Sequence, residues 1–82
     1  MTDSEAVWLV EISLKDWEPN LPGGTRIVSF EEVVASDEIA ARQTGYEQFA
    51  ARCFYDPIMR RKMYNRGITQ HNCRISDVIQ VS

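Results

Sequence analysis

Residues 36–54 read SDEIAARQTGYEQFAARCF, the pattern of a long amphipathic helix. Ser36 is a preferred N-cap residue, and Asp37 and Glu38 place negative charge in the first turn, where the helix dipole favours it. Gly45 falls on the polar side of the helical wheel. At about 1.5 Å per residue the helix is roughly 28 Å long, enough to cross a small domain. Its apolar face consists of Ile39, Tyr46, Phe49, Ala50 and Cys53.

Two segments before this helix alternate in the manner of β-strands. In residues 6–15 one face is apolar throughout, and Val7 and Leu9 make the start of the second face apolar as well. In residues 25–35 a single charged side chain, Glu32, interrupts an apolar face. This interruption predicts a bulge or a strand end near Glu31. The two apolar faces consist of Trp8, Val10, Ile12 and Leu14, and of Val28, Phe30 and Val34.

After the long helix, Asp56 and Pro57 have the pattern of an N-cap followed by the first residue of a second helix. This helix is expected to end at Arg66, with Gly67 as its left-handed stop. Residues 72–81 then alternate as a third strand. One side of this strand carries Cys73, Ile75, Ile79 and Val81, and Asp77 interrupts it.

The order strand, strand, helix, helix, strand predicts a single α+β domain over residues 1–82, with residues 1–5 frayed and residues 16–24 forming a loop. A right-handed crossover lays the last strand beside the first. The expected sheet is three-stranded and mainly antiparallel, in the order 2-1-3, and the long helix, joined by the short one, covers one face. The apolar side chains of Val7 and Leu9 on the opposite face indicate association with another molecule.

The composition of the 82 residues, 44% apolar and 26% charged, is that of a globular domain. There is no apolar run of membrane-spanning length and no basic start followed by an apolar segment, which argues against a membrane protein or a secretory signal. Two cysteines predict a reducing compartment, the cytoplasm. The net charge of −3 is unevenly divided, because residues 1–38 carry −7 and residues 39–82 carry +4.

Side chains that could carry chemistry are few. Cys53, His71 and Cys73 are of metal-binding type, but they lack the paired spacing of a zinc site and the orienting group of a nucleophile. Glu31 and Glu32 are neighbours on a strand, so they point to opposite faces and do not form a catalytic pair. The sequence therefore predicts no enzyme activity, no catalytic residue, no metal and no cofactor.

Three surfaces remain as candidates for function. The first is an acidic surface around a tryptophan, of the kind that binds a basic protein surface. The second, an alternative, is a basic cluster in the second helix that contacts nucleic acid, although its cations are spread around the wheel. The third is the contact of a homo-oligomeric structural subunit. The residues are Asp16, Trp17, Glu18, Glu31 and Glu32 for the first surface, and Arg60, Arg61, Lys62, Tyr64 and Arg66 for the second.

Three runs, VWLVEI at 7–12, VVASDE at 33–38 and CRISDVI at 73–79, resemble small proteins of bacteriophages and mobile elements, among them anti-CRISPR inhibitors. The resemblance lies in size, element order and acidic character. It implies a non-catalytic protein-binding module of phage or mobile-element origin, acting as a stoichiometric inhibitor or accessory factor in the host cytoplasm.

Overall fold

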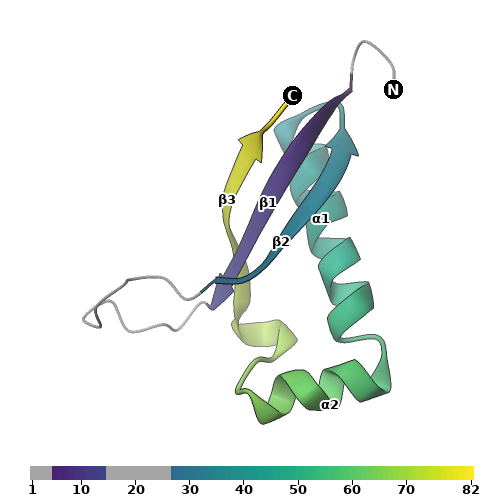
Figure 1. Cartoon of the computed structure of the whole chain (residues 1–82), viewed down its shortest axis with the longest axis vertical. Helices are drawn as coiled ribbons and strands as arrows, with labels where there is room; N and C mark the ends of the chain where they lie inside the picture. Colours follow the sequence, from purple (N-terminus) through teal and green to yellow (C-terminus); the bar gives the residue numbers. More distant parts are fainter. Residues whose placement is uncertain (1–4, 15–26) are drawn as a thin grey trace, which may run out of the picture.

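A computed structural model describes residues 5–14 and 27–82 of the chain, which form an α+β fold (Figure 1). The expected element order is confirmed. The predicted loop 16–24 and most of the predicted frayed end lie outside the described residues. The elements are β1 (Ala6–Leu14), β2 (Ile27–Ala35), α1 (Glu38–Cys53), α2 (Pro57–Asn65), the 3-10 turn η1 (Gln70–Asn72) and β3 (Cys73–Gln80).

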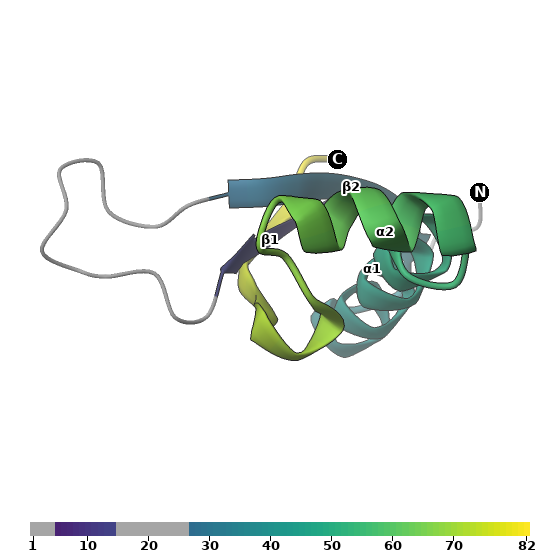
Figure 2. The same ribbon diagram turned by 90° about the horizontal axis from the view of Figure 1, so that it is seen from below.

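The three strands form one antiparallel sheet in the order β2-β1-β3, as the sequence predicts. Helix α1 runs along one face of this sheet, and α2 lies across the end of the molecule (Figures 1 and 2). Val10 and Ile12 of the central strand are fully buried beneath α1. Trp8 is half-buried and donates its indole N–H to the carbonyl oxygen of Ala35 at 3.0 Å, joining β1 to the end of β2.

Helix α1 begins one residue later than the sequence predicts. Asp37, with extended backbone angles, is the N-cap, and its carboxylate accepts the Ala40 N–H at 2.8 Å. Ser36, the predicted cap, lies outside the helix. Both residues suit the role, and a carboxylate additionally interacts with the positive end of the helix dipole.

Replacing Asp37 with alanine is expected to lower the free energy of unfolding by about 1 kcal/mol, because the Ala40 N–H loses its partner. The matched change Ser36→Ala is expected to leave stability within about 0.5 kcal/mol. Urea denaturation followed by circular dichroism measures both. A larger loss for Ser36→Ala than for Asp37→Ala would place the cap where the sequence pattern had it.

The face that α1 turns to the sheet differs from the predicted one. Gly45, expected on the polar side, is buried, and an added Cβ would lie 2.7 Å from Cγ2 of Val10. Ile39, expected on the apolar face, is 76% exposed. The helix approaches the central strand closely through small residues, and such residues give little signal in an apolar pattern. The buried residues of α1 are Ala41, Gly45, Phe49, Ala50 and Cys53.

Strand β2 runs through to Ala35 without a strand end or bulge at Glu31. Its register shift lies earlier, opposite the step from Ile12 to Ser13. Glu31 and Val33 point toward α1 and are buried, so Phe30, Glu32 and Val34 lie on the outer face, whereas Val28, at the register shift, packs against the core. No bulge is needed to turn Glu32 away from the core, because its side chain already lies on the solvent side of the sheet.

An irregularity in strand β3 explains why Asp77 interrupts the apolar alternation of residues 72–81. The register with β1 shifts between Glu11 and Ile12, so that two residues of β3, Ser76 and Asp77, occupy one step of the ladder. A bulge reverses the side on which later residues point. Ile75 therefore faces the helix, whereas Asp77 and Ile79 lie on the outer face.

Helix α2 begins as expected and ends at Asn65, one residue before the predicted end at Arg66, which is the C-cap. The Asp56 carboxylate accepts the N–H groups of Ile58 and Met59 at 2.9 and 3.2 Å, and Pro57 occupies the first turn. The chain leaves the helix through Gly67, whose φ of +76° is the left-handed conformation that favours glycine.

Candidate functional site

The outer face of the sheet carries a continuous apolar surface. Val7 of β1 is paired with Val34 of β2, and Leu9 of β1 is paired with Ile79 of β3. Beyond the end of β3, the Val81 N–H donates to the carbonyl oxygen of Val7 at 2.8 Å, which extends the surface by one more residue. We call this surface the open face; its apolar residues are Val7, Leu9, Phe30, Val34, Ile79 and Val81.

Within residues 5–14 and 27–82, no helix lies on the open face, because α1 covers the opposite side (Figures 1 and 2). Phe30 and Val34 are each 50% exposed, and Val81 is 54% exposed. In a monomeric protein a contiguous apolar patch of a few hundred Å² often marks a site of interaction. Val7 and Leu9, predicted to form an exposed strip, lie on this uncovered face but are themselves half-buried. The exposed apolar side chains of the face belong to the two neighbouring strands.

Three carboxylates border the apolar residues of the open face. Glu32 is paired with Leu9, and Glu11 lies between Phe30 on β2 and Asp77 on β3. Glu11 accepts a hydrogen bond from the Ser76 hydroxyl at 2.7 Å, and Asp77 accepts one from the Val78 N–H at 2.9 Å. Like charges directly opposite each other on a sheet are unfavourable. A cation brought to Glu11 and Asp77 would remove this repulsion.

Glu31 does not belong to the open face, because its side chain is buried between β2 and α1. Arg52 of α1 binds it with both guanidinium nitrogens, at 2.9 Å to Oε1 and 2.6 Å to Oε2. Gln48 donates to Oε1 at 3.1 Å, and the Ser29 hydroxyl also donates to the carboxylate. Burial raises the pKa of Glu31. The hydrogen bonds and the charge of Arg52 together lower it by more than burial raises it, so the pKa of Glu31 lies below its ordinary value.

Of the predicted acidic surface, only Glu32 is both described and exposed. Asp16, Trp17 and Glu18 lie outside the described residues. Phe30, Val34, Asp77 and Ile79 were missing from the predicted site. The interruptions of the apolar pattern at Glu32 and Asp77 were the available signal, since a charged residue within an apolar alternation indicates a face that meets solvent.

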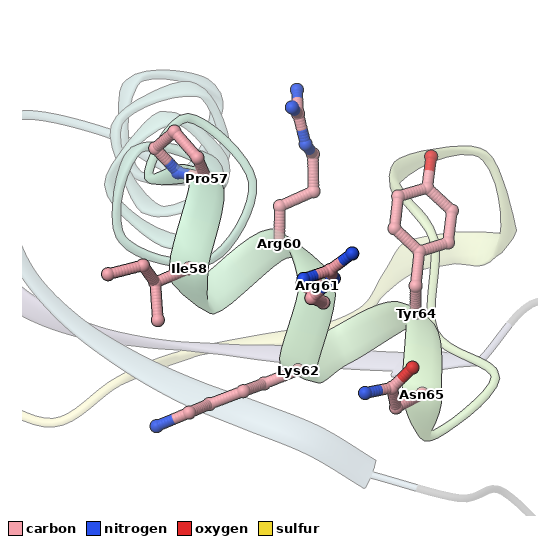
Figure 3. A pocket seen from close by; sticks show the side chains of 7 residues that line it. All are labelled: Pro57, Ile58, Arg60, Arg61, Lys62, Tyr64 and Asn65. Atoms are coloured by element: carbon pink, nitrogen blue, oxygen red, sulfur yellow. The ribbon is translucent and has the colours of Figure 1, made fainter.

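Four residues of the predicted nucleic-acid surface, Arg60, Arg61, Lys62 and Tyr64, lie on α2, and Arg66 is the C-cap that follows the helix. Arg60 and Tyr64 project to the same side of the helix, and Lys62 points away from them (Figure 3). The side chains enclose a shallow hollow on the outer surface of α2. The lining residues are Pro57, Ile58, Arg60, Arg61, Lys62, Tyr64 and Asn65.

The cysteines are buried and not bonded to each other. Burial, together with the neighbouring Cys53, raises the pKa of the Cys73 thiol, which disfavours the thiolate that a nucleophile or a metal ligand needs. His71 is exposed. Among the described residues, no three His, Cys, Asp or Glu side chains gather closely enough to hold a metal ion.

No helix in the described part of the chain has the length and apolar character to span a membrane. Comparisons with protein-family models, with curated proteins and with solved structures gave no match to this chain.

Proposed function

We propose that this chain is a non-catalytic protein-binding module and that the open face of its sheet is the binding surface. The observation that carries the proposal is the row of six apolar side chains, from three strands, on the side of the sheet that α1 leaves uncovered. Burying such a surface against a partner is favourable by about 25 cal/mol per Å² of apolar area.

The border of the open face defines the chemistry of the partner. Glu11, Glu32 and Asp77 face the same side as the apolar residues, and neither ion pair of the described residues, Arg42–Glu38 and Arg52–Glu31, involves them. A partner with an apolar centre and lysines or arginines around it matches this arrangement. Complementary charge of this kind accelerates association and selects the partner.

The size of the face favours a different protein over a second copy of this chain. Three strands of nine residues or fewer cover roughly 15 by 30 Å, or about 450 Å². Two such faces together bury about 900 Å², less than the roughly 1,200 to 2,000 Å² of a stable interface. A larger partner can extend its contacts over the edges of the sheet. A second copy of this chain would instead bring its own acidic residues to the interface, where they would repel Glu11, Glu32 and Asp77.

In this proposal the resemblance to small phage proteins adds a role. Stoichiometric binding to a basic surface of a host protein would block that surface, so the module would act as an inhibitor or as an accessory factor. The partner itself is to be identified by experiment.

Site-specific photocrosslinking tests the proposal. A benzophenone amino acid is placed at Val34, on the open face, and in a separate protein at Ile39, which is equally apolar and more exposed but lies on α1. After irradiation in an extract of the source cells, we expect a saturable adduct with a basic protein from Val34 only. Equal adducts from both positions, or an adduct from Ile39 alone, would contradict the proposal.

Charge reversal at the border is expected to slow association with the protein captured in this way. The double change Glu32→Lys and Asp77→Lys should reduce the association rate constant about tenfold or more at low salt and remove its salt dependence. Glu47→Lys, on the exposed side of α1, serves as the matched control. Glu31 is left unchanged because a lysine there would stand beside Arg52 in the interior. Equal rates for the double variant and the control would exclude an acidic border that steers the partner.

A further inference from the structure

Helix α2 is attached to the domain by one side only. Met63 is buried and Met59 is half-buried, four residues apart on the inward side. Ile58 is 70% exposed and Tyr64 is 55% exposed, so the rest of the helical surface faces solvent. A helix that presents this much of its circumference can be reached by a ligand from several directions.

The segment around α2 carries a concentrated positive charge. Residues 57–76 contain five basic and no acidic side chains, so they carry +5 and the rest of the chain carries −8. The nearest acid before this segment, Asp56, is occupied as the N-cap of α2. The ion pairs of the described residues lie elsewhere, on α1. Among the described residues, none of the cations of α2 therefore takes part in an ion pair.

We infer that α2 binds single-stranded nucleic acid, with its cations on the phosphates and the Tyr64 ring stacked on a base. Arg60 and Tyr64 are four residues apart and point the same way, so a guanidinium and an aromatic ring flank one position (Figure 3). Binding sites for single strands combine these two elements, a positive surface that follows the backbone and an aromatic ring on which a base stacks. This inference is independent of the protein-binding function proposed for the sheet.

The arrangement favours a single strand over a duplex. Arg60, Arg61 and Lys62 are consecutive, so their side chains leave the helix about 100° apart and cannot all enter one groove. A flexible strand can bend around the helix and reach them in turn. The acidic border lies on the open face of the sheet, whereas α2 lies across the end of the molecule (Figure 2).

Fluorescence anisotropy with a labelled oligothymidylate tests the inference on the full chain. For three phosphates contacted, we expect the logarithm of the binding constant to fall with the logarithm of salt concentration with a slope of about −2. No binding at the lowest salt concentration, or tighter binding to a duplex of the same length, would overturn the inference.

Variants separate the contribution of the cations, which contact phosphates, from that of the Tyr64 ring, which stacks on a base. Arg60→Ala combined with Arg61→Ala should weaken binding about tenfold or more and reduce the slope to about −0.7. The control Arg42→Ala removes an exposed cation from α1 and should change nothing. Tyr64→Ala should lose at least about fivefold while Tyr64→Phe keeps the affinity, because stacking needs the ring and not the hydroxyl. If a polyglutamate peptide competes as well as the oligonucleotide and Tyr64→Ala has no effect, α2 is a general anion surface and the inference is wrong.

Discussion

Replacing Arg52 with alanine is expected to destabilise the fold by about 3 kcal/mol, because it leaves the Glu31 carboxylate buried without its cation. Arg52 supplies two charge-assisted hydrogen bonds to that carboxylate, and the remaining donors, Gln48 and Ser29, are neutral. Arg42→Ala is the matched control, since it breaks the exposed pair with Glu38 at 3.5 Å on the same helix. We expect the control to change stability by less than about 0.5 kcal/mol in urea denaturation. Equal effects would mean that Glu31 is not buried as described.

The ion pair between Glu31 and Arg52 also predicts that the free energy of unfolding depends on pH. In the native protein the pKa of Glu31 is lowered from its ordinary value of 4.5, so the stability it contributes is present above that value. This contribution is lost as the pH falls through the lowered pKa of the folded state. In Arg52→Ala the hydrogen bonds and the charge of Arg52 no longer lower the pKa of Glu31, so this pKa lies higher than in the native protein and protonation of Glu31 costs the variant less. The difference in unfolding free energy between the two proteins should therefore shrink on acidification below about pH 4.5. A difference that stays constant to pH 3 would contradict this.

Gly45→Ala is the second change with a large expected effect. An added Cβ would stand 2.7 Å from Cγ2 and 2.8 Å from Cβ of Val10, and a β-branched side chain on a central strand has little room to move. Overpacking of this kind costs about 1–3 kcal/mol, against a gain of about 1 kcal/mol in helix propensity. We expect a net loss of up to about 2 kcal/mol in urea denaturation.

A double-mutant cycle isolates the contact. Val10→Ala alone should be destabilising, but combined with Gly45→Ala it should cost less than the sum of the single changes, by about 1 kcal/mol. The exposed neighbour Thr44→Ala controls for helix propensity and should be neutral or stabilising. If Gly45→Ala stabilised the fold as Thr44→Ala does, α1 would not approach the central strand as closely as described.

The sequence was sufficient for the architecture because its signals there are local and strong. Asp56, Pro57 and Gly67 mark the two ends of α2 by capping and backbone preferences. The alternation in β1 correctly places Val10 and Ile12 in the core. The antiparallel pairing followed from the single loop that joins the first two strands, and the strand order followed from the handedness of the crossover.

The sequence was insufficient for the packing faces because these depend on partners that lie far away along the chain. Glu31 is accepted in the interior only because Arg52, on a different element, reaches it. Gly45 faces the core only because Val10 comes close to it. The bulge at Ser76 and Asp77 shifts Ile79 to the outer face, and the interruption at Asp77 indicates a solvent-facing residue but not this change of side.

The central claim is that the sheet turns Val34 outward and Val33 inward, because the open face exists only with this orientation. Thiol labelling of Val33→Cys and Val34→Cys tests it on two adjacent positions. The native cysteines are buried and give a low background. We predict that Val34→Cys reacts rapidly in the native protein and that Val33→Cys reacts only as fast as the protein unfolds. Rapid labelling of Val33→Cys with protection of Val34→Cys would contradict the claim.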